Sequence, residues 1–189
     1  MSLKNSITTA SYMDFDSTLN KSMKLLKDKK NFKIAFLTIL GINVGLRISD
    51  LLELKHEDMI GESFQVIEKK TSKPRTIKIN DTIKAAYISY IEMLGKVNNN
   101  EYLFISQKKE RFSIRQVNRL LQQLYGAKNK NISSHSLRKT FGRRVWNNDN
   151  QSERALIMLS KLFNHTSSAT TRLYLGIEQE ELNDIYMTL

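Results

Sequence analysis

Three segments of the chain place arginine, histidine and tyrosine side chains among apolar residues, where polar groups need partners. Arg47 stands at a predicted junction between two helices and is flanked by leucine and isoleucine. His135 and Arg138 share one face near the N-terminus of a predicted helix, where the helix dipole favours a phosphate. His165 stands at a predicted helix end, and Tyr174 lies nine residues further on. Each residue alone also fits a structural role, but together they indicate chemistry on an anionic group.

Other kinds of chemistry lack the residues that they need. The chain has no cysteine, which excludes thiol catalysis, Cys-ligated zinc, iron–sulfur clusters and disulfides. It has three histidines, and the cluster of His56, Glu57 and Asp58 indicates a solvated loop rather than a metal site. A Walker-type phosphate loop and a serine nucleophile elbow are both missing. We therefore predict neither a metal ion nor another cofactor.

The charge of the chain favours an anionic partner. Its 189 residues carry 30 Lys and Arg against 19 Asp and Glu, a net charge of +11, and the pI is about 9.8. This favours nucleic acid first and an acidic membrane second. Residues 173–189 hold four acids and no Lys or Arg, so the basic charge lies in the body. The longest uncharged stretch, 34–46, is shorter than the roughly 20 residues that span a bilayer, and we predict a cytoplasmic protein without membrane contact.

The elements that must position these side chains are predicted to be mostly helices. Hydrophobic spacing, one proline and seven glycines indicate an α+β fold, mainly α, with one small antiparallel hairpin. The predicted strands are 64–67 and 76–79, joined by the basic run 69–75. The predicted helices cover residues 15–28, 31–44, 48–54, 81–94, 114–124, 133–146, 152–163, 168–174 and the acidic tail.

Five motifs, taken in their order and spacing, resemble the tyrosine recombinase (phage integrase) family. They are Gly-Leu-Arg-Ile-Ser-Asp-Leu-Leu at 45–52, a lysine-bearing hairpin at 69–79, His-Ser-Leu-Arg at 135–138, Leu-Phe-Asn-His at 162–165 and Thr-Thr-Arg-Leu-Tyr-Leu-Gly at 170–176. The resemblance implies a helical catalytic domain over 15–176, preceded by an N-terminal extension (1–14) and followed by an acidic C-terminal tail helix (177–189). One departure is Asn164, where many relatives have glycine before the histidine; asparagine tolerates the positive φ of such a turn.

The resemblance implies a role for each matched residue. Tyr174 would be the nucleophile, forming a 3′-phosphotyrosyl bond and leaving a free 5′-hydroxyl. Arg47 and Arg138 would clamp the phosphate, and His165 would add a further donor. His135 would accept the proton of Tyr174. Because the bond energy stays in the protein–DNA link, rejoining would need no ATP or metal.

A lysine of the hairpin would protonate the leaving 5′-oxygen, and two lysines are candidates. Lys70 is favoured because it follows the first strand and precedes Thr71 and Ser72, while Lys73 is the alternative general acid. Asp50 would orient Arg47, or the two would form a purely structural pair. Four further residues are predicted to bind DNA, with positioning on the backbone favoured over sequence readout: Arg111, Arg115, Arg119 and Lys139.

The predicted function is therefore site-specific recombination or integration of double-stranded DNA by a bacterial, phage or mobile-element enzyme associated with the nucleoid. Two alternatives are a non-catalytic DNA-binding module on the same fold and a type IB-like topoisomerase. The resemblance also implies a homo-oligomer on DNA, a tetramer joined through the C-terminal tail. The alternatives are a tail that packs on its own domain and a monomeric free protein. Family members usually carry an N-terminal core-binding domain, so the chain is either a catalytic-domain fragment or a short recombinase.

Overall fold

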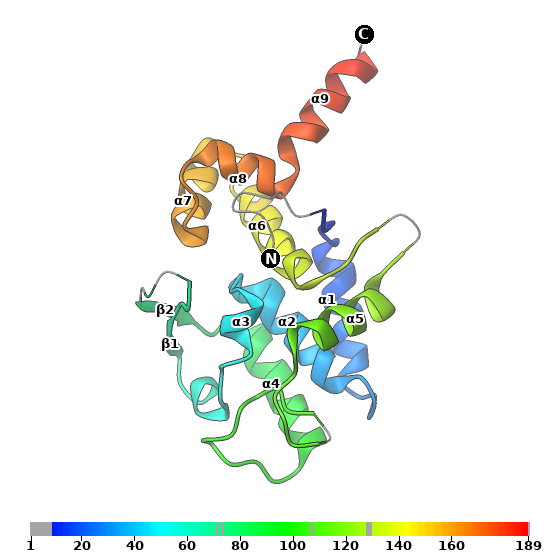
Figure 1. The fold of residues 1–189 in the computed structure, drawn as a ribbon, viewed down its shortest axis with the longest axis vertical. Helices are drawn as coiled ribbons and strands as arrows, with labels where there is room; N and C mark the ends of the chain where they lie inside the picture. Colours follow the sequence, from blue (N-terminus) through cyan, green and yellow to red (C-terminus); the bar gives the residue numbers. More distant parts are fainter. Residues whose placement is uncertain (1–8, 71, 73, 107, 128–129, 189) are drawn as a thin grey trace.

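The structure is a computed structural model that describes residues 9–70, 72, 74–106, 108–127 and 130–188. Within them the fold is mainly helical with one two-stranded sheet, which confirms the predicted fold class (Figure 1). The helices are α1 (Phe15–Leu25), α2 (Phe32–Val44), α3 (Ile48–Leu51), α4 (Asp81–Leu94), α5 (Ile114–Tyr125), α6 (Ser134–Asn148), α7 (Glu153–Phe163), α8 (Ser168–Leu175) and α9 (Ile177–Thr188). The strands are β1 (Ser63–Ile67) and β2 (Pro74–Lys78), and η1 (His56–Met59) is a 3₁₀ helix.

Helix α2 forms the centre of the larger hydrophobic core. It is apolar on all sides, as expected of a helix surrounded by others, and it packs against α1, α4 and α6. Phe36 of α2 stacks on Tyr90 of α4, with ring centroids 4.6 Å apart. Gly45 ends the helix with φ 63°, and a Cβ there would lie 2.3 Å from the ring of Phe141. The left-handed turn and the close contact both require glycine, and together they set the direction of the chain into Arg47.

The β-hairpin packs one face onto this core. The two strands are antiparallel, with Phe64 opposite Ile77 and Val66 opposite Arg75. Phe64, Val66 and Ile77 are buried, whereas Ile67 points outward and is 70% exposed. The alternation follows the period of two expected of a half-buried strand.

A smaller core joins α6, α7 and α8. It contains Trp146, Leu156, Leu159, Phe163 and Leu175, all buried. Helix α7 ends at Asn164 in the left-handed region (φ 53°, ψ 48°), so asparagine makes the turn predicted for it. Figure 1 shows α7 and α8 stacked beside α6 and above the hairpin.

Helix α9 projects from this end of the molecule (Figure 1). Its first turns are tied to the body: Glu180 pairs with Arg143, and Glu181 pairs with Arg172. Beyond them the apolar side chains are open to solvent, with Tyr186 75% and Met187 85% exposed. Across the described residues, no helix combines the length and apolar character needed to cross a membrane.

One prediction about the loops was wrong. His56 was expected in a solvated loop, but it begins η1 and is 2% exposed. Its Nδ1 lies 3.0 Å from the Tyr87 hydroxyl, and its ring packs beside Tyr90. The aromatic side chains of α4 offer this imidazole a hydrogen bond and ring contacts, which the local sequence around His56 does not reveal.

Candidate active site

Arg47, Arg138, His165 and Tyr174 come from separate segments and converge where α2, α6, α7 and α8 meet. Arg47, in the turn between α2 and α3, donates from Nη2 to the carbonyl oxygen of Phe163 at the end of α7, 3.0 Å away. Arg138 of α6 donates from Nη1 to a carbonyl oxygen at the end of α2. The rings of His165 and Tyr174 meet edge to face with centroids 5.2 Å apart. The charges of both arginines also act on the Tyr174 hydroxyl, so the four residues form one cluster.

Arg138 is the buried cation of this cluster. It is 5% exposed, and its guanidinium carbon lies 4.2 Å from the centroid of the Phe163 ring. Its Nη2 atom is buried and has no hydrogen-bond partner among the described residues. Burial lowers the pKa of Arg138 to about 10, against the opposing effect of Tyr174, so the side chain stays charged at pH 7.

Tyr174 presents a protonated phenol to the cluster. It lies in the last turn of α8, and its ring meets that of Phe163 edge to face. The hydroxyl oxygen is buried without a hydrogen-bond partner in the part of the chain that the structure describes. Burial raises the pKa of Tyr174 to about 12, while the charges of Arg138 and Arg47 act to lower it. Loss of the proton therefore needs a base or further positive charge at the oxygen.

His165 is a neutral imidazole at pH 7. Burial, followed by the charges of Arg138 and Arg47, lowers its pKa to about 4. Its Nδ1 lies 2.9 Å from the hydroxyl oxygen of Thr171, which is 3.4 Å from the carbonyl oxygen of Ser167. We assign the hydroxyl proton to the shorter contact, which leaves the proton of His165 on Nε2 as a donor.

Two buried polar atoms without partners therefore lie in one cluster, Arg138 Nη2 and Tyr174 Oη. Buried polar groups are nearly always satisfied, so such a pair marks a place for an external group. Two guanidinium groups and a neutral imidazole donor match the oxygens of a phosphate, which accepts several charge-assisted hydrogen bonds.

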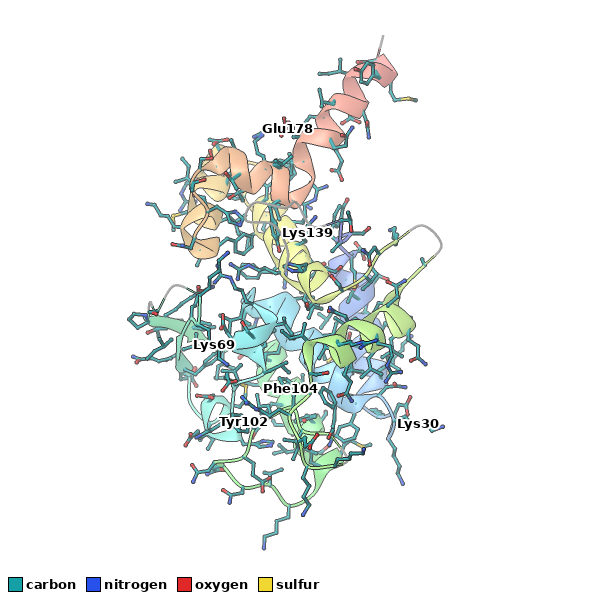
Figure 2. All side chains as sticks on the ribbon, in the orientation of Figure 1. Lys30, Lys69, Tyr102, Phe104, Lys139 and Glu178 are labelled. Carbon is teal, nitrogen blue, oxygen red and sulfur yellow. The ribbon has the colours of Figure 1, made fainter. Side chains whose placement is uncertain are left out.

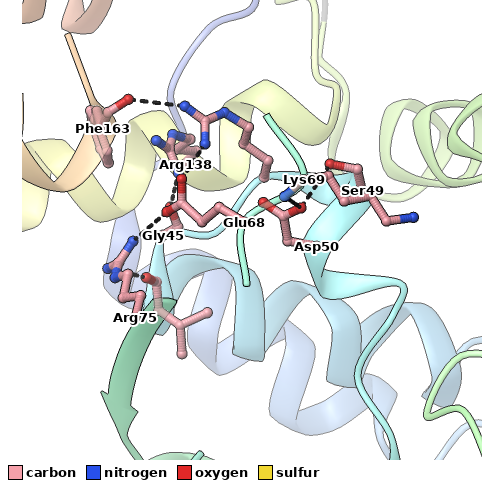
Figure 3. Close-up of polar contacts among 10 residues, drawn as sticks. Gly45, Ser49, Asp50, Glu68, Lys69, Arg75, Arg138 and Phe163 are labelled. Carbon is pink, nitrogen blue, oxygen red and sulfur yellow. Dashed lines mark hydrogen bonds and ion pairs between the residues drawn. The ribbon is translucent and has the colours of Figure 1, made fainter. Parts of the chain in front are cut away.

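The hairpin adds a carboxylate that the sequence analysis did not single out. Glu68 directly follows β1 and is 5% exposed. Its Oε2 lies 2.5 Å from Nη1 of Arg47, and its Oε1 lies 3.5 Å from Nη1 of Arg75 on β2 (Figure 3). Burial acts to raise its pKa, but the hydrogen bond and charge of Arg47, with the charges of Arg138 and Arg75, hold the pKa below its usual range.

No hydrogen bond or ion pair found among the described residues joins the side chains of Asp50 and Arg47. Asp50 Oδ1 accepts hydrogen bonds from the main-chain nitrogen of Lys69 and from the Ser49 hydroxyl, both at 3.2 Å (Figure 3). Arg47 precedes α3 with an extended backbone, so its side chain reaches toward α7, whereas Asp50 lies inside α3 and faces the segment after β1. Glu68 is the carboxylate that pairs with Arg47.

Of the two candidate general acids, the structure describes Lys70, which follows β1 and Glu68. Lys70 is exposed, and its charge contributes to the low pKa of His165 after burial and the two arginines. Lys70 therefore lies close enough to the cluster for its charge to act on His165. Lys73 lies outside the described residues.

Two further predicted residues lie on α6. His135, in the first turn, is exposed, yet partial desolvation and then the charges of Lys139 and Arg138 lower its pKa, so it is neutral at pH 7. The hydrogen bonds found among the described residues do not join His135 to Tyr174. Lys139, predicted to bind DNA, is 6% exposed, and its Nζ lies 5.4 Å from the centroid of the Tyr174 ring. In this conformation Lys139 faces the tyrosine rather than solvent.

The other predicted DNA-binding residues are exposed. Arg115 and Arg119 lie on α5, and Arg111 pairs with Glu53 and lies 4.6 Å from the centroid of the Tyr102 ring. A cleft beside α5 is lined by basic side chains: Lys29, Lys30, Lys33, Lys108, Arg111 and Arg119. Figure 2 shows Lys30 far from Lys139 along the long axis of the molecule, so basic side chains reach well beyond the cluster.

Sequence reasoning missed Glu68, Arg75 and Thr171. Only Glu68 left a signal: it continues the alternation of Phe64 and Val66, so the strand period places its carboxylate on the buried face. Such a carboxylate needs a cationic partner. Arg75 and Thr171 act through contacts between separate segments, and their spacing alone carries no signal.

The chain was compared with known proteins. A model of the phage integrase family matches residues 13–181. The chain belongs to this family. The finding confirms the predicted family and enzyme class, a tyrosine recombinase, and it covers every described residue of the cluster.

Relatives and solved structures agree with this membership. The chain is 33% identical over 169 residues to a probable integrase/recombinase, YoeC, of Bacillus subtilis, covering 88% of each chain. It is 30% identical to tyrosine recombinase XerC of Caldanaerobacter subterraneus, covering 88% of this chain and 48% of that one, so it spans about half of that relative. The fold matches a crystal structure of XerA recombinase with a TM-score of 0.68 and 22% identity, over 98% of this chain and 66% of that one. A lambda integrase dimer bound to a core site matches with a TM-score of 0.63 and 20% identity, over 90% and 49%.

Proposed function

We propose that this recombinase cuts and rejoins double-stranded DNA through a covalent bond between Tyr174 and a 3′-phosphate. The observation that carries the proposal is the pair of buried, unpartnered atoms in one cluster, the Tyr174 hydroxyl and Arg138 Nη2. A nucleophile and a cationic donor held at one position are the two requirements for attack on a phosphodiester. Recombinases of this fold have been solved in complex with their substrates, XerH with difH and the Tn1549 transposon integrase with transposon right end DNA, which supports double-stranded DNA as the partner.

In the proposed reaction, Tyr174 Oη attacks phosphorus while the bond from phosphorus to the 5′-oxygen breaks. Arg47 and Arg138 hold the non-bridging oxygens, and the Nε2 proton of His165 adds a third donor. The phenol proton passes to His135, and Lys70 protonates the leaving 5′-oxygen. One ester bond forms as another breaks, so the reverse step rejoins DNA without an energy source.

Because the pKa of Tyr174 is raised to about 12, another group must accept its proton during the reaction. His135 is neutral at pH 7 and can accept a proton. It is exposed and makes no described hydrogen bond to Tyr174, so we infer that DNA binding brings the two groups together, directly or through water. This inference also explains how the enzyme would keep the phenol inactive before DNA arrives.

We further propose that DNA runs along the basic side chains from the hairpin past α5, and that copies of the chain assemble on it. Helix α9 supports an assembly role because its outer half carries exposed Leu182, Ile185 and Tyr186 on an acidic helix, while its first turns stay tied to the parent domain. We infer that the assembly on DNA is a tetramer. We also infer that the protein acts in the cell compartment that holds the DNA.

A covalent trap tests the proposed reaction. The substrate is a labelled pool of duplexes with randomised centres and a nick beside the centre. Cleavage releases a short fragment that carries the 5′-hydroxyl. Loss of this fragment prevents rejoining, so the covalent adduct accumulates. We expect a protease-sensitive shifted band on a denaturing gel for the wild type and for Tyr186→Phe, and none for Tyr174→Phe. DNA binding without an adduct in the wild type would indicate a binding module instead, and relaxation of a supercoiled plasmid without exchange would indicate a topoisomerase.

A further inference from the structure

Glu68 is a buried acid in a site that must bind an anion. A carboxylate here repels an incoming phosphate, so its presence requires an explanation beyond the needs of binding. It is 5% exposed, and its two oxygens face different cations from different segments, Arg47 before α3 and Arg75 on β2. The charge of Arg138 acts on it as well.

The contacts of Glu68 determine where the guanidinium of Arg47 points. One terminal nitrogen of Arg47 bonds Glu68 at 2.5 Å and the other bonds the Phe163 carbonyl at 3.0 Å. Two fixed acceptors on a planar group hold its plane and leave the remaining N–H bonds for an external oxygen. Arg75 is held less tightly: its Nη1 forms an ion pair with Glu68 Oε1 at 3.5 Å without a hydrogen bond, and its Nη2 donates to the carbonyl oxygen of Val44 at 3.3 Å.

We propose that Glu68 is a positioning residue that orients Arg47 for the scissile phosphate and, by its charge, weakens ground-state binding of that phosphate. The inference rests on the proposed DNA cleavage and adds to it the group that sets the geometry of the arginine clamp. It makes a specific prediction: removal of the charge strengthens DNA binding and slows the chemical step. A role in folding alone would not produce both changes.

The chain contains a matched control. Glu53 also bridges two cations, Lys69 and Arg111, and its replacement by glutamine removes the same charge. Its side chain is 33% exposed, against 6% for Glu68, and its cations are not those of the clamp. Glu53→Gln therefore reports the general effect of one added positive charge on DNA binding.

The test measures DNA binding by fluorescence anisotropy at fixed salt, and the rate of adduct formation at saturating nicked duplex. For Glu68→Gln we expect binding about three- to tenfold tighter than the wild type, and tighter than for Glu53→Gln. We expect its adduct to form about 10- to 100-fold more slowly, because a displaced clamp loses alignment. Glu53→Gln should form the adduct at the wild-type rate.

Glu68→Asp separates the effect of the charge from the effect of side-chain length. It also provides a second test if Glu68→Gln does not fold. It keeps the charge but is one methylene shorter, so DNA affinity should stay within about twofold of the wild type while adduct formation remains slow. Glu68→Gln and Glu53→Gln with equal rates and affinities, or Glu68→Asp with the wild-type rate, would overturn the inference even if the wild type forms its adduct. If the wild type forms no adduct, the proposed DNA cleavage is refuted instead. The DNA affinities of Glu68→Gln and Glu53→Gln would then still test whether the charge of Glu68 weakens binding.

Discussion

The two halves of the site differ in how completely their charges are satisfied. On the hairpin side, Arg47 is bonded to Glu68 and to a carbonyl oxygen, and Arg75 shares the same carboxylate. On the side built by α6 to α8, Arg138 Nη2 and Tyr174 Oη are buried without partners among the described residues. Arg75 Nη1 and Asp50 Oδ2 on the hairpin side also lack hydrogen bonds among the described residues. The difference lies in the ion pairs: Arg47 and Arg75 both face the carboxylate of Glu68, whereas Arg138 forms no ion pair with a described residue.

The difference indicates where substrate binding changes the energy most. Burial shifts the pKa of three groups in the α6–α8 half: Tyr174 to about 12, His165 to about 4 and Arg138 to about 10. A phosphate that enters there supplies the missing acceptor for Arg138. In the proposed reaction the hairpin half would keep its internal ion pairs and would form the frame against which the phosphate is placed.

The largest effect should come from the α6–α8 half. Arg138→Lys keeps the charge but loses the paired donors of a guanidinium, so we expect adduct formation to fall by about 10²- to 10³-fold. Arg75→Lys, on the hairpin side, should lower the rate less than about tenfold. Rapid-quench measurements on nicked duplex compare the two variants, and equal losses would break the distinction between the halves.

The stability of the protein should depend on pH through His165. Its pKa is about 4 when folded and 6.5 when unfolded, so the unfolded state binds more protons between these values. Its stabilising effect is therefore complete above pH 6.5 and is lost as the pH falls toward 4. We expect the free energy of unfolding to drop by on the order of 2 kcal/mol from this group between pH 7 and 4.5.

Urea denaturation of the wild type and of His165→Gln at both pH values checks this. The variant should show a smaller drop by about that amount, since glutamine does not titrate. A drop of the same size in both proteins would mean that burial does not hold His165 neutral. It would also contradict the view that burial shifts the pKa values of the α6–α8 half.

A smaller effect is expected at Thr171, which fixes the tautomer of His165. Thr171→Val keeps the shape and removes the hydroxyl, so His165 loses the partner of Nδ1. We expect adduct formation about tenfold slower, with rescue by Thr171→Ser. Thr170→Val, on the exposed face of α8, is the control and should keep the wild-type rate; no change in Thr171→Val would show that the ring needs no such support.

Much of the fold and part of the site could be predicted from the sequence. Hydrophobic spacing located several helices, since a period of 3.6 persists over many residues in α4 and α5, while α2 is marked by its long apolar run. Helix ends were harder: α1 ends at Leu25 rather than 28, and α3 at Leu51 rather than 54. The residues of the cluster were found because they stand in short motifs with a characteristic order.

The partners of these residues could not be found in the same way. The predicted partner of Arg47 was Asp50, from the same motif, yet the bond runs to Glu68, 21 residues away. The contact depends on how the hairpin packs against the end of α2. The Arg47 bond to the Phe163 carbonyl oxygen is a main-chain contact over 116 residues, for which no side-chain motif exists.

Identification of the residue that bears DNA is the most direct test of the central claim, that Tyr174 is the nucleophile of this cluster. The trapped adduct should be digested with a Glu-specific protease, because Glu178, Glu180 and Glu181 separate Tyr174 from Tyr186, whereas trypsin leaves both on one peptide after Arg172. Mass spectrometry should then find the nucleotide remnant on Tyr174, attached through a 3′-phosphate, with a free 5′-hydroxyl on the released strand. A remnant on any other residue, or attachment through a 5′-phosphate, would contradict the account.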